Sequence, residues 1–456
     1  MASWCICVRL VMCRQRNRTE DRSQVTAKSR AMSSSSPQPS PSSEPQSTGT
    51  HDPYASLRLR SFRRYLSGNL ILIIGEQMQK VAVGWEIYER TGSALHLGYV
   101  GLVQFLPIAA LAMITGHVVD HYNRRRILMV ALGFTSLAAL GLAWNSTRTN
   151  SVAALYALLL ISGIAKAFQN PAKSTMIPRI VPREIFSNAV SWNSSGFEMA
   201  SMIGPAIGGL LIGLFRSTVV VYLSSAMAAL IFLLILTGIP SQHQAVGNNS
   251  MTVRSLLAGF RFIRQAKVVQ AAMTLDMVAV LLGGATTLMP IFAKDILQVG
   301  PRGLGWLLAA PSIGACSMAL LLAHRPPLRK AGRALLLAVT GFGVATVLFG
   351  ISRNFWLSLA MLFLIGACDN ISVVVRQTLV QLLTPDEMRG RVGALNGLFI
   401  GTSNELGGFE SGLVAGFFGP LAAVVSGGLG TVFVVIGVAW LWPQLRNYGT
   451  LGNTDE

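Results

Sequence analysis

The sequence has little charge for its length. Only 12% of its 456 residues are charged, whereas 52% are hydrophobic, and the mean hydropathy is +0.52. A soluble protein of this size carries about twice that fraction of charged residues. The composition therefore excludes an ordinary soluble domain.

Sites that need clustered reactive side chains are also missing from the sequence. The cysteines lie near the N-terminus (Cys5, Cys7, Cys13) or singly in apolar runs (Cys316, Cys368), which excludes a disulfide framework and zinc-ligand spacing. No nucleotide-binding P-loop and no Ser/His/Asp constellation is present. We therefore expect neither an enzyme nor an ATP-driven pump, with no catalytic residue, metal site or cofactor.

The net charge of +18 does not form a nucleic-acid surface. The basic residues are scattered over short loops and the N-terminal tail without interleaved aromatic residues, so we expect no nucleic-acid partner. Residues 1–56 are predicted to be a disordered tail, Arg-rich at first and then built from Ser, Pro, Gln and Glu between Ser33 and Ser47. Met32 is a candidate start of the protein, which would leave the basic segment outside it.

Apolar runs of about 20 residues, the length that crosses a bilayer core as a helix, recur after residue 65. They predict an all-α integral membrane protein with twelve transmembrane helices in two pseudo-symmetric six-helix halves. The halves are residues 57–240 and 268–446, joined by a cytoplasmic connecting loop at 241–267 and followed by a tail at 447–456. The predicted spans are 66–88, 94–118, 127–145, 152–172, 190–214, 217–239, 268–292, 303–324, 332–351, 355–380, 391–416 and 420–443.

Loop charges predict the orientation of the chain. Alternate loops are rich in Lys and Arg, as at 124–126, 254–267 and 325–333, whereas the intervening loops hold isolated residues such as Arg90 and Arg148. Because basic loops stay on the cytoplasmic side, both termini are expected there.

A shift of 203 positions relates the two halves. It carries Gly163 to Gly366, Gly204 to Gly407 and Gly209 to Gly412, together with Lys173 to Arg376 and Asn193 to Asn396. Parallel repeats of this kind place a substrate site between the halves near the middle of the membrane.

One short loop combines an acid with several arginines. Gly116, Asp120, Arg124 and Arg125 match the signature between helices two and three of the major facilitator superfamily, which this loop resembles. Asn123 stands where that signature has a second glycine, and Asn also tolerates a left-handed turn. The resemblance implies a conformational latch; plain positive-inside anchoring would explain the arginines but not the Gly and Asp spacing. The equivalent loop in the second half, 323–330, lacks the pattern, so the latch is expected on one side only.

The fifth predicted helix carries Gly204, Pro205, Gly208 and Gly209. These residues resemble the antiporter signature of the same superfamily, which implies an exporter. Generic packing through small residues and a proline bend is the alternative. Further segments resemble the secretion-effector, enterobactin-exporter-like branch: Phe62-Arg63, Gly75-Glu76, Thr91-Gly92-Ser93, Asn170-Pro171-Ala172 and 383–392.

Ionisable residues inside predicted spans are functional candidates, because burying a charge there is costly. The proton-coupling candidates are Glu76, Glu198, Asp276 and Asp369, and the cavity candidates are Lys80, Lys166 and Gln77. Glu76 and Lys80 are spaced i, i+4 and could simply neutralise each other. Glu405 and Glu410 rank lower, while Lys173 and Arg376 fit snorkelling anchors, with Lys173 also a candidate partner of Asp120.

These observations lead to one functional prediction. We expect a monomeric multi-pass transporter of the bacterial inner membrane that exports a small organic molecule, siderophore-like or drug-like, by proton antiport with alternating access. A proton-independent facilitator or importer of the same fold is the alternative. A transport-dead scaffold would be expected to have lost the acids and the loop signature, and neither is lost.

Overall fold

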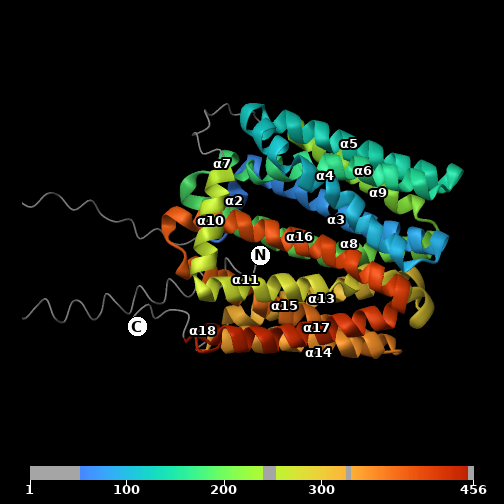
Figure 1. Ribbon diagram of the computed structural model, residues 1–456. Coiled ribbons are helices and arrows are strands. Elements are labelled where there is room, and N and C mark those ends of the chain that lie inside the picture. Colours follow the sequence, from blue (N-terminus) through green and yellow to red (C-terminus); the bar gives the residue numbers. More distant parts are fainter. Residues whose placement is uncertain (1–51, 240–252, 325–329, 450–456) are drawn as a thin grey trace, which may run out of the picture.

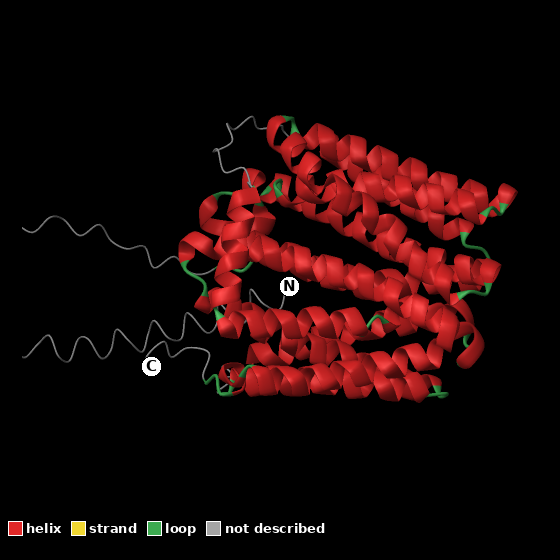
Figure 2. Cartoon of the chain, in the orientation of Figure 1, coloured by secondary structure: helices red, strands yellow, loops and turns green. Residues whose placement is uncertain are grey.

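The computed structural model describes residues 52–239, 253–324 and 330–449. Within these ranges the chain is helical with short connecting loops and contains no strand (Figure 2). The predictions for residues 1–51, including Met32, and for 240–252, 325–329 and 450–456 lie outside the described residues.

The chain forms two bundles that lie one above the other in Figure 1. The first bundle consists of α2 (Ala55–Arg58), α3 (Arg60–Thr91), α4 (Ala94–His121), α5 (Arg124–Trp144), η1 (Asn145–Thr149), α6 (Val152–Ser174), α7 (Ile177–Ile180), η2 (Arg183–Ile185), α8 (Phe186–Phe215) and α9 (Val219–Thr237). The second consists of α10 (Val253–Gln265), α11 (Lys267–Leu282), η3 (Ala285–Leu288), α12 (Met289–Ile291), η4 (Phe292–Ile296), α13 (Gly300–His324), α14 (Ala331–Ile351), α15 (Phe355–Leu383), α16 (Asp386–Phe418), α17 (Pro420–Leu441) and α18 (Pro443–Arg446).

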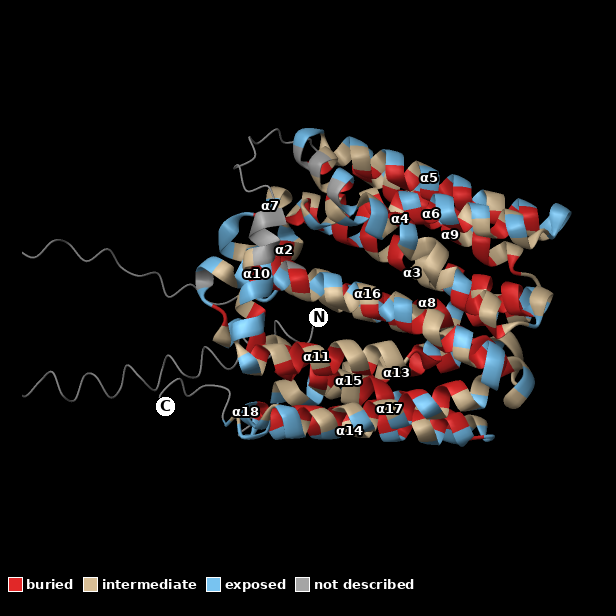
Figure 3. Ribbon diagram, viewed as in Figure 1, coloured by how far each residue is buried: buried red, intermediate tan, exposed pale blue. Residues whose placement is uncertain are grey.

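Ten helical segments in the described residues are long and apolar enough to cross a membrane. The helices α3 and α16, with 32 and 33 residues, are not among these ten, and both carry ionisable residues along their length. The two run beside the apolar helices (Figure 1), so the predicted twelve spans require both of them. Large apolar side chains such as Leu234, Phe433 and Trp440 are exposed, as expected where lipid replaces water. Exposed and buried residues alternate along helices such as α5 and α14 (Figure 3).

The packing within each bundle repeats. In the first bundle α3 packs on α8 and α9, and α4 on α6; in the second α11 packs on α16 and α17, and α13 on α15. The bundles meet mainly through two helix pairs, α8 with α13 and α4 with α16. The pseudo-symmetry that the 203-residue shift predicts is therefore present in the fold.

Several predicted boundaries are wrong. The helix expected at 66–88 begins at Arg60 and ends at Thr91, and the one expected at 190–214 begins at Phe186. The span expected at 268–292 is broken at Gly283 and Gly284, after which the chain continues as η3, α12 and the π-helix η4. A Cβ at Gly284 would collide with the carbonyl oxygen of Gly407, so the break accompanies a close approach to α16.

Residues 253–265, inside the expected connecting loop, form the helix α10. Its Gly259 packs against Leu395 and Arg391 of α16, and Ile263 is buried. In Figure 1 α10 crosses the end of the bundle where α2 and α18 also lie. We call this end, which also includes Arg124 to Arg126, the basic end, and the opposite end, with Gly92, Asn150 and Gly300, the closed end.

Candidate substrate site and gates

A cluster of charged and amide side chains lies inside the first bundle, between α3, α4 and α6. The Glu76 carboxylate accepts a hydrogen bond of 2.8 Å from Gln169, and the Lys166 ammonium donates one of 3.0 Å to the Gln104 carbonyl. Gly163 makes the second bond possible, because a Cβ there would come within 2.6 Å of the backbone oxygen of Gln104. A small pocket is lined by Glu76, Gln79, Lys80, Val83, Gln104, Thr135, Ser162 and Lys166.

The expected local neutralisation of Glu76 by Lys80 does not occur as a direct contact. Direct ion pairs form elsewhere, between Arg58 and Asp52, Arg90 and Glu86, and Arg376 and Asp276. Glu76 instead lies in the field of three ammonium groups, those of Lys173, Lys166 and Lys80. Lys80 is exposed although it lies in the middle of a 32-residue helix, so its ammonium faces an accessible space.

Glu405 of α16 belongs to the same cluster, although sequence reasoning ranks it low. Its carboxylate interacts electrostatically with Lys80 and Lys166 of the first bundle. Its Oε2 atom lies 3.0 Å from the position of a Cβ at Gly101, so the missing side chain on α4 makes room for it. Acids and bases of both bundles therefore meet at one level.

Gln77 and Glu198, two further candidates, lie outside this cluster. Gln77 donates a hydrogen bond of 2.9 Å to the Ser201 hydroxyl, which places it at the interface between α3 and α8. Glu198, also on α8, is half-buried and acts electrostatically on Asp369 of the second bundle.

The second bundle holds a dry ion pair. The Nε atom of Arg376 lies 3.2 Å from the Asp276 carboxylate, and both side chains are less than a tenth exposed. Arg376 also donates a hydrogen bond of 2.8 Å to Asn396 of α16. The expectation that Arg376 snorkels to the membrane surface is wrong, because a buried carboxylate one helix away provides its partner. Asp369 lies close enough to interact with both members of the pair.

The glycine and proline motif of α8 packs against two different helices. Gly204 and Gly208 approach α3, where added Cβ atoms would lie 2.6 Å from the Gln77 Cβ and 3.0 Å from the Met78 Cα. Gly209 faces the other way, and its Cβ would lie 2.7 Å from the Cα of Gly305 on α13. The motif thus joins the two bundles by backbone contact.

Gly412, the repeat-related residue of Gly209, makes the matching contact between α16 and α4. A Cβ at Gly412 of α16 would lie 2.6 Å from the Cα of Gly98 on α4. Tyr88 donates a hydrogen bond to Asp295 of η4, and Lys294 lies 5.6 Å from the Tyr88 ring centroid. These contacts between the bundles gather towards the closed end.

At the basic end the glycines of α4 and α16 have open space around them. In the described residues, a Cβ added at Gly116 of α4, or at Gly390, Gly393, Gly397 or Gly401 of α16, would meet nothing within 4 Å. In this conformation no described atom packs closely where a side chain of Gly116 would lie. The close approaches of glycines between α4 and α16 lie towards the other end, as at Gly98 and Gly101.

The predicted latch loop is held mainly by its arginines and by Asn123. Arg125 donates a hydrogen bond of 2.7 Å to the Thr237 carbonyl of α9, and Arg124 one of 3.0 Å to the Val119 carbonyl. Asn123 has a φ of −64° rather than a left-handed value, and its side chain accepts from the backbone N–H groups of Arg125 and Arg126. Asn123 is thus the N-cap of α5. The side chain of Asp120 lies outside the described part of the chain.

Comparisons with known proteins agree with this architecture. The family model described as transmembrane secretion effector matches residues 51–448. The enterobactin exporter EntS of Escherichia coli K12 is 26% identical over 392 residues, covering 85% of this chain and 93% of the relative.

Solved structures of low sequence identity share the fold. The D-xylose-proton symporter superposes with a TM-score of 0.66 at 13% identity, covering 86% of this chain and all of that one. A bacterial homologue of the human lysosomal transporter Spinster, inward-facing and occupied, superposes with a TM-score of 0.65 at 14% identity, covering 88% and 98%. These comparisons indicate a carrier of small molecules across a membrane rather than an enzyme. The chain belongs to the transmembrane secretion effector family of the major facilitator superfamily.

Proposed function

We propose that this chain exports a small organic molecule from the cytoplasm across the bacterial inner membrane, in exchange for protons and by alternating access. The observation that carries the proposal is the meeting of Glu76, Lys80, Lys166 and Glu405 between an end where the bundles touch and an end where they part. A transporter of this superfamily needs such a site between its repeats.

The positive-inside rule supports the assignment of sides. The basic end carries Arg124 to Arg126, α10 and both described ends of the chain, which favours the cytoplasmic side for it. The conformation described is then open to the cytoplasm and closed to the outside. A substrate would enter from the cytoplasm and reach Lys80.

The chemistry of the site supports a substrate rich in oxygen. Lys80 and Lys166 present ammonium donors, and Gln104 presents an amide. Ammonium groups bind carboxylate and other anionic oxygens strongly when water is scarce. The relative at 26% identity is named an enterobactin exporter, so siderophores are the first compounds to test.

The placement of the acids supports proton exchange. Glu405 of the second bundle interacts electrostatically with Lys80 of the first, so the strength of this interaction depends on how the bundles sit relative to each other. When the two bundles separate here, Lys80 moves away from Glu405. A carboxylate that loses a neighbouring cation takes up a proton more readily. Proton uptake would thereby be linked to the change of conformation.

The experiment measures proton movement in everted inner-membrane vesicles that contain the full chain. Addition of enterobactin should release protons in vesicles with the wild-type chain, and Glu76→Gln and Glu405→Gln should each reduce the signal at least tenfold. Glu184→Gln, an exposed acid at the basic end, is the matched control and should leave the signal unchanged. Transport of enterobactin without any proton signal would disprove the exchange.

A proton-independent facilitator or importer is the second candidate, and the charge balance favours it. Asp276 already has Arg376 as its partner, and Lys166 and Lys173 already balance Glu76. Counterflow exchange without a pH gradient, together with net accumulation that persists when the gradient is collapsed, would establish this alternative.

A further inference from the structure

A second pocket lies at the closed end, separate from the charged cluster. Its volume is about 630 Å³, within the usual range for small-molecule sites. It is formed by the end of α3, the turn after η1, the α8–α9 connection and the start of α13. The lining residues are Trp85, Glu86, Glu89, Arg90, Ser146, Asn150, Ile212, Gly213, Arg216, Ser217, Thr218 and Pro301. We call it the closed-end pocket.

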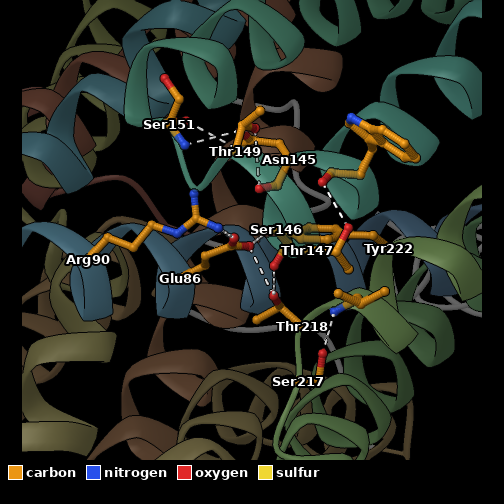
Figure 4. A network of polar contacts seen from close by, with 12 residues as sticks. Glu86, Arg90, Asn145, Ser146, Thr147, Thr149, Ser151, Ser217, Thr218 and Tyr222 are labelled. Carbon is orange, nitrogen blue, oxygen red and sulfur yellow. Dashed lines mark hydrogen bonds and ion pairs between the residues drawn. The ribbon is translucent and has the colours of Figure 1, made fainter.

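Beneath the pocket a polar network holds Glu86. This carboxylate is 3% exposed and accepts hydrogen bonds from Arg90, from Tyr222 and, at 3.0 Å, from Thr218 (Figure 4). Ser146 lies 3.0 Å from the Thr218 hydroxyl and extends the network towards η1. Because several donors already satisfy Glu86, this acid is not available to a ligand.

Arg90 retains unused donor capacity. Its Nη2 atom bonds Glu86, but its Nη1 atom is buried and has no hydrogen-bond partner. A buried guanidinium N–H without an acceptor is costly, so a small shift of the Arg90 side chain that brings this N–H to an acceptor in the pocket would be favourable. The exposed guanidinium of Arg216 lines the same pocket. The acid Glu89 also lines the pocket and is exposed like Arg216, so the pocket carries charges of both signs.

The backbone around the pocket is unusual. Asn150 and Arg216 have φ values of 48° and 52°, and they are two of the three non-glycine residues with positive φ in the described chain. The segment η1, next to Asn150, is a π-helix. Strained residues and π-helical turns occur preferentially at functional sites, so these features support a binding role.

We propose that the closed-end pocket binds a small organic acid. The carboxylate would lie between Arg90 and Arg216, and an aromatic or aliphatic body would pack against Trp85, Ile212 and Pro301. Two arginines suit a carboxylate because each guanidinium presents paired donors.

Binding there would hold the closed end shut. Pro301 belongs to the second bundle and the other lining residues to the first, and Arg302 of α13 donates a hydrogen bond of 3.4 Å to the Gly213 carbonyl. When the bundles part at this end, the pocket loses one wall. A ligand that binds only the complete pocket therefore shifts the population towards the closed form. With the basic end in the cytoplasm the acid would arrive from outside the cell, and only that statement rests on the proposed function.

The first experiment measures binding of salicylate to the purified full chain by equilibrium dialysis, with the uncharged salicylamide as the matched probe. Saturable binding of salicylate and weaker binding of salicylamide are expected. Arg216→Asn should weaken salicylate binding about tenfold, the size expected for losing one charge-assisted bond. Asn suits the left-handed backbone of residue 216, so the fold should persist.

The control is Arg148→Gln, an arginine of the same end that lies 5.6 Å from the Trp144 ring centroid and does not line the pocket. It should leave salicylate binding unchanged. Equal binding of the two probes, or equal effects of the Arg216 and Arg148 variants, would overturn the proposal.

The second experiment measures hydrogen exchange of the backbone amides at 95–101 and 409–415, where α4 meets α16. Salicylate should slow this exchange and salicylamide should not, because opening of the closed end exposes these amides. Binding of salicylate without slower exchange would overturn the claim that the ligand holds this end shut. Neither experiment depends on enterobactin or protons, so failure here is distinguishable from failure of the export proposal.

Discussion

The two bundles place acids and bases on equivalent helices but use them differently. In the second bundle Asp276 of α11 and Arg376 of α15 form a direct, buried ion pair. In the first bundle Glu76 of α3 lies near Lys173 of α6, the repeat-related residue of Arg376, yet no ion pair forms between them in the described structure. Asp276 and Arg376 are therefore a closed pair that stabilises packing, whereas the charges around Glu76 are an open set without a direct pair. The direct pair of the first bundle, Arg90 with Glu86, lies at the closed end.

The largest effect is expected when the closed pair is broken. Asp276→Leu leaves Arg376 charged and buried without its partner, which should lower the free energy of unfolding by about 3 to 5 kcal/mol. Thermal unfolding of the purified protein, followed by fluorescence, measures the change.

The double variant Asp276→Leu/Arg376→Met is the control for that change. It removes both charges and should recover most of the lost stability, because an apolar pair can replace a buried ion pair. If the double variant unfolds as readily as the single one, the pair is not primarily structural and the comparison between the bundles fails.

The second effect concerns the contacts that close one end. Gly209→Leu and Gly412→Leu each put a large side chain at a helix contact between the bundles, where an added Cβ alone would lie less than 3 Å from the facing backbone. Each should lower the transport rate at least tenfold, because the closed end can no longer form. Uptake into everted vesicles measures the rate.

Gly437→Leu on α17 is the matched control, since a Cβ there would meet nothing within 4 Å. It should leave transport intact. Loss of transport in only one of the two glycine variants would show that the repeat-related contacts are not equivalent.

The third effect tests the open set of charges. Lys80→Gln should raise the KM for an acidic substrate about tenfold and leave the unfolding temperature nearly unchanged, because the Lys80 side chain is exposed and makes no direct ion pair in the described structure. Concentration-dependent transport, together with thermal unfolding, separates the two quantities. A large fall in stability would place Lys80 with the structural charges instead.

The smallest effect tests the loop before α5. Asn123→Ala removes the cap and should cost about 1 kcal/mol of unfolding free energy, whereas Asn123→Gly should cost only a few tenths. Thermal unfolding of both variants measures the difference. If the glycine variant were the more stable of the two and exceeded the wild type, a turn preference rather than capping would explain this position.

Much of the fold could be predicted from the sequence, because apolar length and the 203-residue repeat are properties of the chain itself. The backbone contacts of Gly204, Gly208 and Gly209 also follow from residue size. The ion pair of Arg376 with Asp276 could not be predicted from the sequence, because the depth of a residue along a helix does not say which face of the helix it occupies. The repeat contained a usable signal, since it relates Arg376 to Lys173 and both lie opposite an acid on the first helix of their half.

The charged cluster was predicted only in part for a similar reason. Glu76, Lys80 and Lys166 were identified as single intramembrane charges, and the structure brings them together. Glu405 joins the cluster only because α16 packs against α4. The sequence around Glu405 does not indicate this packing. The space for its carboxylate comes from Gly101, a residue about 300 positions away in the sequence.

The break after α11 has a mechanical consequence. Asp276 lies on α11, before Gly283 and Gly284, whereas Asp295, the acceptor of the Tyr88 bond, lies beyond them on η4. A helix interrupted by two glycines bends more easily than a continuous one. The Tyr88–Asp295 contact and the Asp276–Arg376 pair therefore lie on separate segments of this stretch of chain. The chain from Lys267 to Ile296 thus carries a structural ion pair and a contact between the bundles on two segments that the glycines separate.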